Sequence, residues 1–166
     1  MPHPRPGPVS TGITRAQAAG WDVCLVLSPS AHHWLEPDLP ALAQLTGHPV
    51  RHQYKHPDEP DVLPPPDALL VAPATLNTLT KWADGHADTL ALGLITEALG
   101  LRLPQVALPY LNTAQAAHPA FHRSVTTLRE HGVTVLLGDG GHTPHPPKHG
   151  NAAAYPWDAA IAALPT

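Results

Sequence analysis

Hydroxyl and amide side chains follow an apolar run near the middle of the chain, where they could hold a flat polar ligand. The run is residues 68–72, and the stretch 73–78 after it contains Thr75 and Asn77 among small residues. Hydroxyl and amide groups both donate and accept hydrogen bonds, as the edge of a planar heterocycle requires. This stretch is therefore the first candidate binding site.

Three further apolar runs also end next to proline, glycine or polar residues. They are residues 22–27 before Ser28 and Ser30, residues 105–108 before Asn112, and residues 133–137 before a glycine-rich stretch. Short apolar runs bounded in this way predict strands that are buried on both faces of a sheet. Because ligands bind at the carboxyl ends of parallel strands, we expect a binding crevice at that edge.

The segments between the runs are rich in alanine and leucine and predict helices. We expect helices over residues 13–19, 36–43, 79–92, 121–132 and 158–164. Strands that alternate with helices predict an α/β fold, with a three-layer, doubly wound and mostly parallel sheet of roughly five or six strands. A chain of 166 residues can bury one core, so we expect a single domain.

The ends of the chain differ in composition from its middle. Residues 1–14 are rich in proline and are expected to be irregular, and the domain is expected over residues 15–166. Within it, residues 138–151 predict a flexible Gly/Pro/His loop. The histidines here and at His118 and His122 have no cysteine or paired carboxylate beside them in sequence, so no metal site is assigned.

Charge and cysteine content exclude several classes of function. The formal net charge is −4 without a basic cluster, which argues against a nucleic-acid partner. No apolar run is long enough to span a membrane, and no secretory signal is evident. The single cysteine, Cys24, lies in an apolar run and reads as a small buried hydrophobic residue. These observations predict a cytoplasmic protein.

Two motifs in a fixed order resemble a known family. The segment Pro-Ala-Thr-Leu-Asn-Thr at 73–78, with Lys81, Gly85 and Asp88 after it, resembles the flavin-binding signature of the homo-oligomeric flavin-containing cysteine decarboxylases. The segment 109–116 resembles their second motif, Pro-x-Met-Asn-x-x-Met-Trp. The family includes phosphopantothenoylcysteine decarboxylases and lantibiotic peptidyl-cysteine decarboxylases, and flavin prenyltransferases are related. The resemblance covers about residues 21–135 and implies a flavodoxin-like (Rossmann-like) fold.

The resemblance implies FMN as cofactor and a cysteinyl carboxylate as substrate, either a peptide C-terminal cysteine or a small cysteine conjugate. It also implies a homo-oligomer, a trimer or a multiple of one. The residues that match the flavin-binding positions are Ala74, Thr75, Asn77 and Thr78, with Ser28 and Ser30 toward the ribityl phosphate. Asn112 matches the residue that binds the substrate carboxylate, and Gln115 lies beside it in the second motif.

The chain departs from the family pattern at several positions. Where the relatives carry a histidine before the flavin motif, this chain has Glu59; His56 could substitute, or the role is absent or taken by another residue. The Met and Trp of the second motif are Gln115 and Ala116, so we expect a rebuilt substrate pocket. The proline-rich segment 1–12 replaces the family's first strand, which indicates a misplaced start codon or a missing strand.

Other interpretations of the same residues stay open. Thr75 or Asn77 could cap a helix, Ser28 and Ser30 could serve a turn, and Asn112 could be a turn residue. The protein could also be a non-catalytic flavin-binding or interaction subunit, or an enzyme like the flavin prenyltransferases. The prenyltransferase reading needs a basic pocket for a prenyl phosphate, and few arginine or lysine residues lie in the loops.

Overall fold

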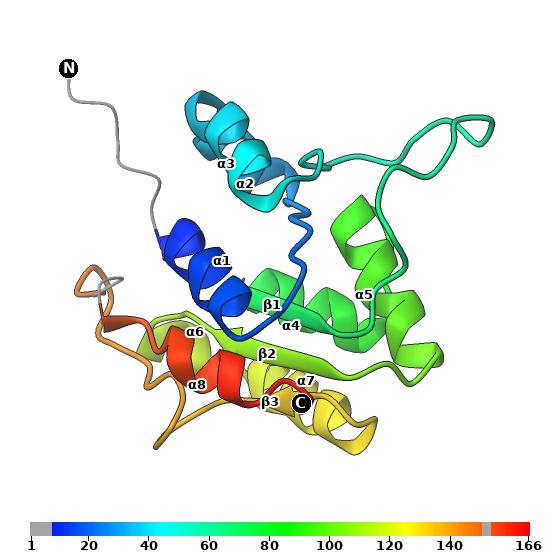
Figure 1. Ribbon diagram of the computed structural model, residues 1–166. Helices are drawn as coiled ribbons and strands as arrows, with labels where there is room; N and C mark the ends of the chain where they lie inside the picture. Colours follow the sequence, from blue (N-terminus) through cyan, green and yellow to red (C-terminus); the bar gives the residue numbers. More distant parts are fainter. Residues whose placement is uncertain (1–7, 151–153) are drawn as a thin grey trace. The chain divides into compact units, whose positions relative to one another are not determined.

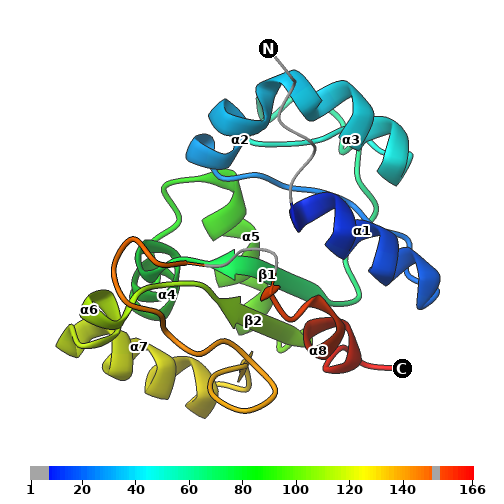
Figure 2. The ribbon, with the colours of Figure 1, turned by 90° about the vertical axis from the view of Figure 1, so that its left-hand side faces the viewer.

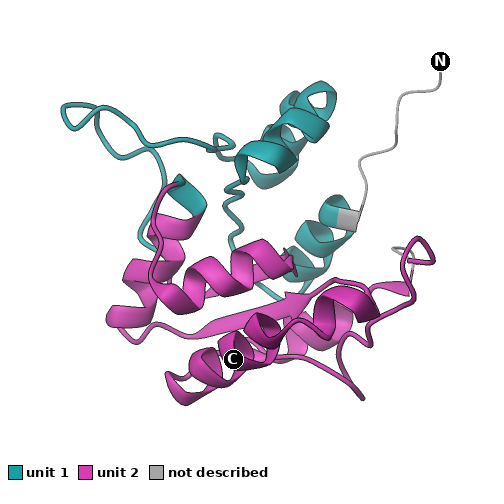
Figure 3. Cartoon of the chain, turned by 180° about the vertical axis from the view of Figure 1, so that it is seen from behind, with its two compact units in different colours: residues 1–66, 89–91 teal, residues 67–88, 92–166 magenta. Residues whose placement is uncertain are grey.

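The computed structural model describes residues 8–150 and 154–166. The chain forms two compact units, one within residues 1–66 and 89–91, the other made of residues 67–88 and 92–166 (Figure 3). The single domain expected over residues 15–166 stays a prediction. No helix in the described ranges is long and apolar enough to cross a membrane.

A parallel sheet forms the centre of the second unit. Its strands are β1 (Leu69–Ala74), β2 (Gln105–Pro109) and β3 (Thr134–Val135), in the order β1-β2-β3 (Figure 1). β1 pairs with β2 from Leu69↔Gln105 to Ala74↔Pro109. The apolar runs at 68–72, 105–108 and 133–137 therefore each contain a strand, as predicted. Only β2 is buried along its whole length, because the residues of β1 before Pro73 are half-buried and Thr134 of β3 is exposed. The described residues form a sheet of three strands rather than the predicted five or six.

Helices cover both faces of this sheet. They are α4 (Leu76–Asp84), α5 (Leu90–Gly100), α6 (Thr113–Ala116), α7 (Pro119–Glu130) and α8 (Trp157–Ala162) (Figure 2). Every residue of β2 is buried, and its side chains alternate between two hydrophobic clusters. Ala107 packs with α4 and α7, whereas Leu108 packs with α8. The predicted layered α/β architecture follows from this alternation.

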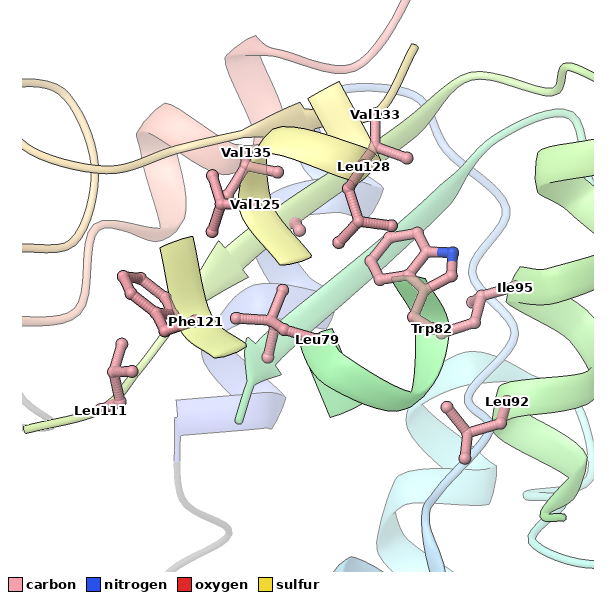
Figure 4. Packing of buried hydrophobic residues seen from close by; sticks show 12 residues of the cluster. Leu79, Trp82, Leu92, Ile95, Leu111, Phe121, Val125, Leu128, Val133 and Val135 are labelled. Carbon is pink, nitrogen blue, oxygen red and sulfur yellow. The ribbon is translucent and has the colours of Figure 1, made fainter. Parts of the chain in front are cut away.

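Helix α4 packs its apolar side against α7. Leu79 and Trp82 of α4 are fully buried, and Figure 4 shows them directed toward Val125 and Leu128 of α7. Burying a side chain of this size stabilises the fold by about 1.5–3 kcal/mol. This packing fixes α4 on the sheet, and with it the position of the polar residues at its first turn.

The predicted helix over 79–92 is wrong in its boundaries. The hydroxyl of Thr75 caps the helix at its start, so α4 begins at Leu76. Gly85 has φ +81°, a left-handed conformation that favours glycine, and it ends α4. Helix α5 then begins at Leu90. One predicted helix is therefore two, because a glycine cap interrupts the apolar pattern.

The first unit is mostly helical, with α1 (Pro8–Ala18), α2 (Pro29–Leu35), the 3₁₀ helix η1 (Glu36–Asp38) and α3 (Leu39–Thr46). The expectation of an irregular segment as far as residue 14 is wrong, because α1 begins at Pro8; residues 1–7 lie outside the described part. A proline at the start of a helix costs no hydrogen bond, since the first N–H groups have no partner within the helix.

The predicted strand over 22–27 is also absent from the described structure. This segment forms only an isolated parallel bridge, Val26↔Arg51, in which Leu27 N–H donates to the Arg51 carbonyl at 2.8 Å. Five of its six residues fall short of full burial, Leu27 being the buried one. The run 22–27 thus has the composition of a strand, but it pairs with another segment only at the bridge between Val26 and Arg51.

Candidate functional site

The loops after β1 and β2 leave the sheet at the same edge. Ala74 and Pro109 are Cα partners at the ends of the two strands, and the Tyr110 N–H donates to the Ala74 carbonyl at 3.1 Å. Thr75 and Asn112 follow these strand ends within a few residues. The predicted convergence of the two polar stretches at the carboxyl edge of a parallel sheet is therefore confirmed for β1 and β2.

In the loop after β1, some residues hold the local structure in place and others are exposed. The Oγ1 atom of Thr75 accepts the N–H of Thr78 at 3.3 Å, and the Thr75 hydroxyl donates to Thr78 Oγ1 at 3.2 Å. Ala74 is fully buried in the core. Asn77 is exposed, and its amide makes no hydrogen bond with any described residue. Asn77 thus offers two donors and an acceptor to a ligand at this edge.

Asn112 begins the short helix α6. Its Oδ1 atom accepts the N–H of Gln115 at 2.8 Å, and the Gln115 Oε1 atom accepts the N–H of Asn112 at 3.3 Å. This reciprocal pair is a capping box. Because the helix engages Oδ1, the orientation of the amide is set, and its Nδ2 hydrogens have no acceptor among the described residues. The half-buried Asn112 therefore presents a neutral donor.

Two histidines that the sequence assigned to a flexible, solvated loop, His142 and His145, hold this second loop in place, and the solvated reading is wrong for the buried His142. The buried His142 lies with Nε2 3.2 Å from the backbone N of Leu111 and 3.0 Å from its carbonyl oxygen. Asn112 and His145 form a parallel bridge, and the Thr113 N–H donates to the His145 carbonyl at 2.8 Å. The segment 138–150, predicted as a flexible loop, is thus paired with the loop after β2; residue 151 lies outside the described residues.

Aromatic rings gather beside the same loop. The ring of Tyr110 lies 5.2 Å from that of His142, 5.0 Å from that of His145 and 5.8 Å from that of Tyr155. The Tyr155 hydroxyl donates to the Leu108 carbonyl, and burial raises the pKa of this phenol. The high histidine content of the segment 138–150 was the only sign of these contacts in the sequence. The contacts join residues about thirty positions apart, and local sequence patterns do not predict contacts over such a separation.

Three predicted site residues lie in the first unit. Ser28 caps α2, its Oγ accepting the N–H of Ala31 at 3.2 Å, and Ser30 is exposed within that helix. His56 is exposed, and its Nδ1 accepts the N–H of Asp58 at 3.3 Å. The turn and capping interpretations of Ser28 are therefore correct locally. The roles of Ser28 and Ser30 toward a phosphate, and of His56 in catalysis, stay predictions.

Two further ionisable groups have defined surroundings. Lys81 donates to Asp88 at 2.7 Å, and this hydrogen bond lowers the pKa of the Asp88 carboxyl. Partial burial and the neighbouring Asp22 raise the pKa of the Cys24 thiol, which disfavours the reactive thiolate. The described residues contain no cluster of three or more His, Cys, Asp or Glu side chains that could bind a metal ion.

A family model described as "Flavoprotein" matches residues 13–165, which include both loops at the sheet edge. Among solved structures, that of the FMN-dependent cysteine decarboxylase SpaF is similar, with a TM-score of 0.62 and 25% sequence identity. That similarity covers 78% of this chain and 76% of SpaF. The predicted α/β fold class is thereby confirmed.

Two curated proteins show similarity in sequence. Over 70 residues the chain is 37% identical to a cysteine/cysteine sulfinic acid decarboxylase of an unknown prokaryotic organism, a match that covers 42% of this chain and 19% of that protein. Over 123 residues it is 28% identical to a probable phosphopantothenoylcysteine decarboxylase of Streptococcus mutans serotype c, covering 70% of this chain and 67% of that one. The chain thus spans less than a fifth of the first relative's length.

Proposed function

The chain belongs to the flavoprotein family, as the resemblance of its two motifs predicted, and on that premise we propose that it binds FMN and oxidatively decarboxylates a cysteinyl carboxylate. The observation that carries the proposal is the pairing of Ala74 with Pro109, which brings the two polar loops to one sheet edge. The substrate is a peptide that ends in cysteine or a small cysteine conjugate. The similarity to SpaF, an FMN-dependent cysteine decarboxylase, supports this reading.

The residues at this edge fit a flavin. The exposed Asn77 amide offers donors and an acceptor that suit the alternating carbonyl and N–H groups along the heterocycle's polar edge. Thr75, engaged with Thr78, holds the first turn of α4 in place. FMN, when bound, supplies the oxidation of the cysteine side chain, and the protein supplies orientation and hydrogen bonds.

Asn112 is the proposed contact for the substrate carboxylate. Its Nδ2 hydrogens are free of partners among the described residues, while its Oδ1 atom is held by the N–H of Gln115. A neutral amide binds a carboxylate without neutralising its charge, so the carboxylate can still leave as carbon dioxide. Gln115, whose side chain completes the capping box, keeps the Asn112 amide in this orientation.

Turnover of a defined peptide tests the proposal. The full chain is supplied with FMN and incubated with a peptide that ends in cysteine, and carbon dioxide release is measured. The same peptide ending in serine, and the cysteine peptide with an amidated C-terminus, serve as controls. We expect release from the first peptide alone. Bound FMN without any release would instead favour a non-catalytic flavin-binding subunit.

Assembly is a separate part of the proposal. The homo-oligomer expected from the family resemblance, a trimer or a multiple of one, is tested by the molar mass of the chain in solution with and without FMN. A monomer under both conditions would refute the proposed homo-oligomer, whereas the assignment of the loops at the sheet edge would be unchanged.

A further inference from the structure

We propose that the stacked side chains of His32 and His52 form a pH-sensitive switch, which attaches α2 to the segment 51–53 at neutral pH and releases it at acidic pH. Both histidines belong to the first unit, and neither lies in the loops at the sheet edge. The switch itself does not depend on the proposed function. Only its expected effect on FMN binding rests on that function.

The two imidazole rings meet where two short segments of the first unit pair. Their centroids lie 3.5 Å apart, and their planes differ by 15°. His32 lies in α2, and His52 directly follows Arg51, the partner of Val26 in the parallel bridge. At this bridge the Leu27 N–H donates to the Arg51 carbonyl at 2.8 Å. The stack therefore adds a contact between side chains to a backbone attachment that consists of a single bridge.

The surroundings of the pair disfavour the uptake of protons. Both side chains are half-buried, and neither ring forms a hydrogen bond or an ion pair with a described residue. Partial burial, the nearby His32 and the Arg51 guanidinium lower the pKa of His52 below its ordinary value of 6.5. The exposed Glu36 follows His32 by four residues and forms no ion pair with a described residue. A proton on the pair thus has no carboxylate among the described residues to stabilise it.

Protonation changes the contact between the rings from attraction to repulsion. Neutral imidazoles stack as aromatic rings do. Once both rings carry a proton, two like charges lie 3.5 Å apart, and the neighbouring Arg51 adds a third positive charge. Imidazole is the side chain whose charge changes in this way near neutral pH. Separation of the rings relieves the repulsion, and α2 then leaves the segment 51–53.

The amino-terminal side of the same bridge responds to acid in the opposite direction. There, His48 Nε2 lies 2.7 Å from Asp22 Oδ1. A proton on His48 makes this contact a charge-assisted hydrogen bond, which is stronger than a neutral one. Acid therefore opens the attachment at α2 while the segments before the bridge stay together.

The direction of the pKa shift defines the pH range of the switch. The pKa of His52 is lowered in the attached state, so the released state takes up the proton more readily. The contribution of His52 to the attachment is complete above pH 6.5 and is lost as the pH falls below that value. About one pH unit lower, a histidine that binds its proton only after release makes release roughly tenfold more favourable.

Amide hydrogen exchange on the full chain without flavin tests the switch. Exchange of the Leu27 N–H, which donates to the Arg51 carbonyl, is compared at about pH 7.5 and about pH 5.5 and corrected for the intrinsic effect of pH. We expect its protection factor to fall roughly tenfold at the lower pH. No fall would overturn the proposal. An NMR titration of the His52 imidazole needs no variant, and a midpoint at or above 6.5 would also overturn the proposal.

Two variants identify the histidines that are responsible. The double variant with His32→Phe and His52→Phe keeps two aromatic rings that do not titrate, so its protection factor should not depend on pH. His33→Phe is the matched control at an exposed position of the same helix, and it should behave like the unaltered chain. A fall of equal size in the double variant and in the unaltered chain would overturn the role of the pair.

The effect on FMN binding is the second readout. Ser28 caps α2 and Ser30 lies within it, and the family resemblance places both toward the ribityl phosphate. FMN should therefore bind more weakly at about pH 5.5 than at about pH 7.5, and the double variant gives the baseline, because the phosphate also takes up a proton in this range. Tighter binding than this baseline at the lower pH would mean that the charged rings attract the phosphate, and would overturn release of α2. Absence of FMN binding at both pH values would count against the proposed function, while hydrogen exchange still decides the switch.

Discussion

His142 Nε2 lies 3.2 Å from the backbone N of Leu111 and 3.0 Å from the Leu111 carbonyl oxygen. It accepts the Leu111 N–H in one tautomer and donates to the carbonyl in the other. Leu111 is buried and directly precedes Asn112. A buried imidazole from a glycine- and proline-rich segment therefore determines where the loop after β2 lies. The geometry of Asn112 depends on residues far along the chain as well as on its own capping box.

Replacing His142 with alanine should loosen the segment 138–150. The change removes the hydrogen bond between Nε2 and the buried Leu111 backbone, at a cost of about 1–3 kcal/mol in the free energy of unfolding. Urea unfolding measures this loss, and trypsin cleavage after the exposed Lys148 reports detachment of the segment. His149→Ala, at an exposed position, should stay within about 0.5 kcal/mol. Equal stability and equal cleavage in both variants would show that His142 does not hold the loop.

Substitutions of Asn112 separate helix capping from substrate binding. Asn112→Ala removes the cap and should cost about 1 kcal/mol. Asn112→Asp keeps an oxygen that can accept the Gln115 N–H, but it replaces the free Nδ2 donors with a negative charge. Both variants should lose carbon dioxide release while FMN stays bound, and only the alanine variant should lose stability. Turnover at the normal rate in the aspartate variant would contradict the carboxylate contact.

We predict that the buried phenol of Tyr155 makes the folded chain less stable at alkaline pH. Burial raises the pKa of its phenol in the folded state above the unfolded value of about 10. The neutral phenol is thus favoured by folding, so its contribution is fully present below pH 10 and decreases as the pH rises above that value. Unfolding free energies of the unaltered chain and of Tyr155→Phe, measured at pH 7 and pH 11, test this.

At pH 7 the phenylalanine variant should be less stable by about 1 kcal/mol, because the Leu108 carbonyl loses the Tyr155 hydroxyl. At pH 11 the difference should shrink or reverse. A constant difference across this range would mean that the phenol ionises equally easily in the folded and unfolded chain.

Local patterns sufficed to predict the strands and the edge at which the polar loops meet. The apolar runs before Pro73 and Pro109 are strands, the first half-buried and the second fully buried, and a parallel sheet brings their carboxyl ends together. The run 22–27 has a similar composition but forms only one bridge, at Val26, because strand formation depends on a partner that composition does not reveal.

Capping and ligand binding were harder to separate from the sequence. Thr75, Asn112 and Ser28 all cap helices, so the interpretation as turn or cap residues is correct for each. Because capping uses only Oδ1 of Asn112, its Nδ2 atom stays available to a ligand. Asn112 can therefore cap α6 and also bind a carboxylate. His142 and His145 could not be placed in advance, because their contacts join segments distant in the sequence and follow no local periodicity.

FMN binding by the unaltered chain and by Asn77→Tyr tests the central claim most directly. Asn77 is exposed and unbonded among the described residues, so the substitution should leave the unfolding free energy within about 0.5 kcal/mol. Titration followed by quenching of flavin fluorescence should show stoichiometric FMN binding by the unaltered chain and little or none by the variant. Equal FMN binding by both proteins, or none by the unaltered chain, would contradict a flavin site at the carboxyl edge of β1 and β2.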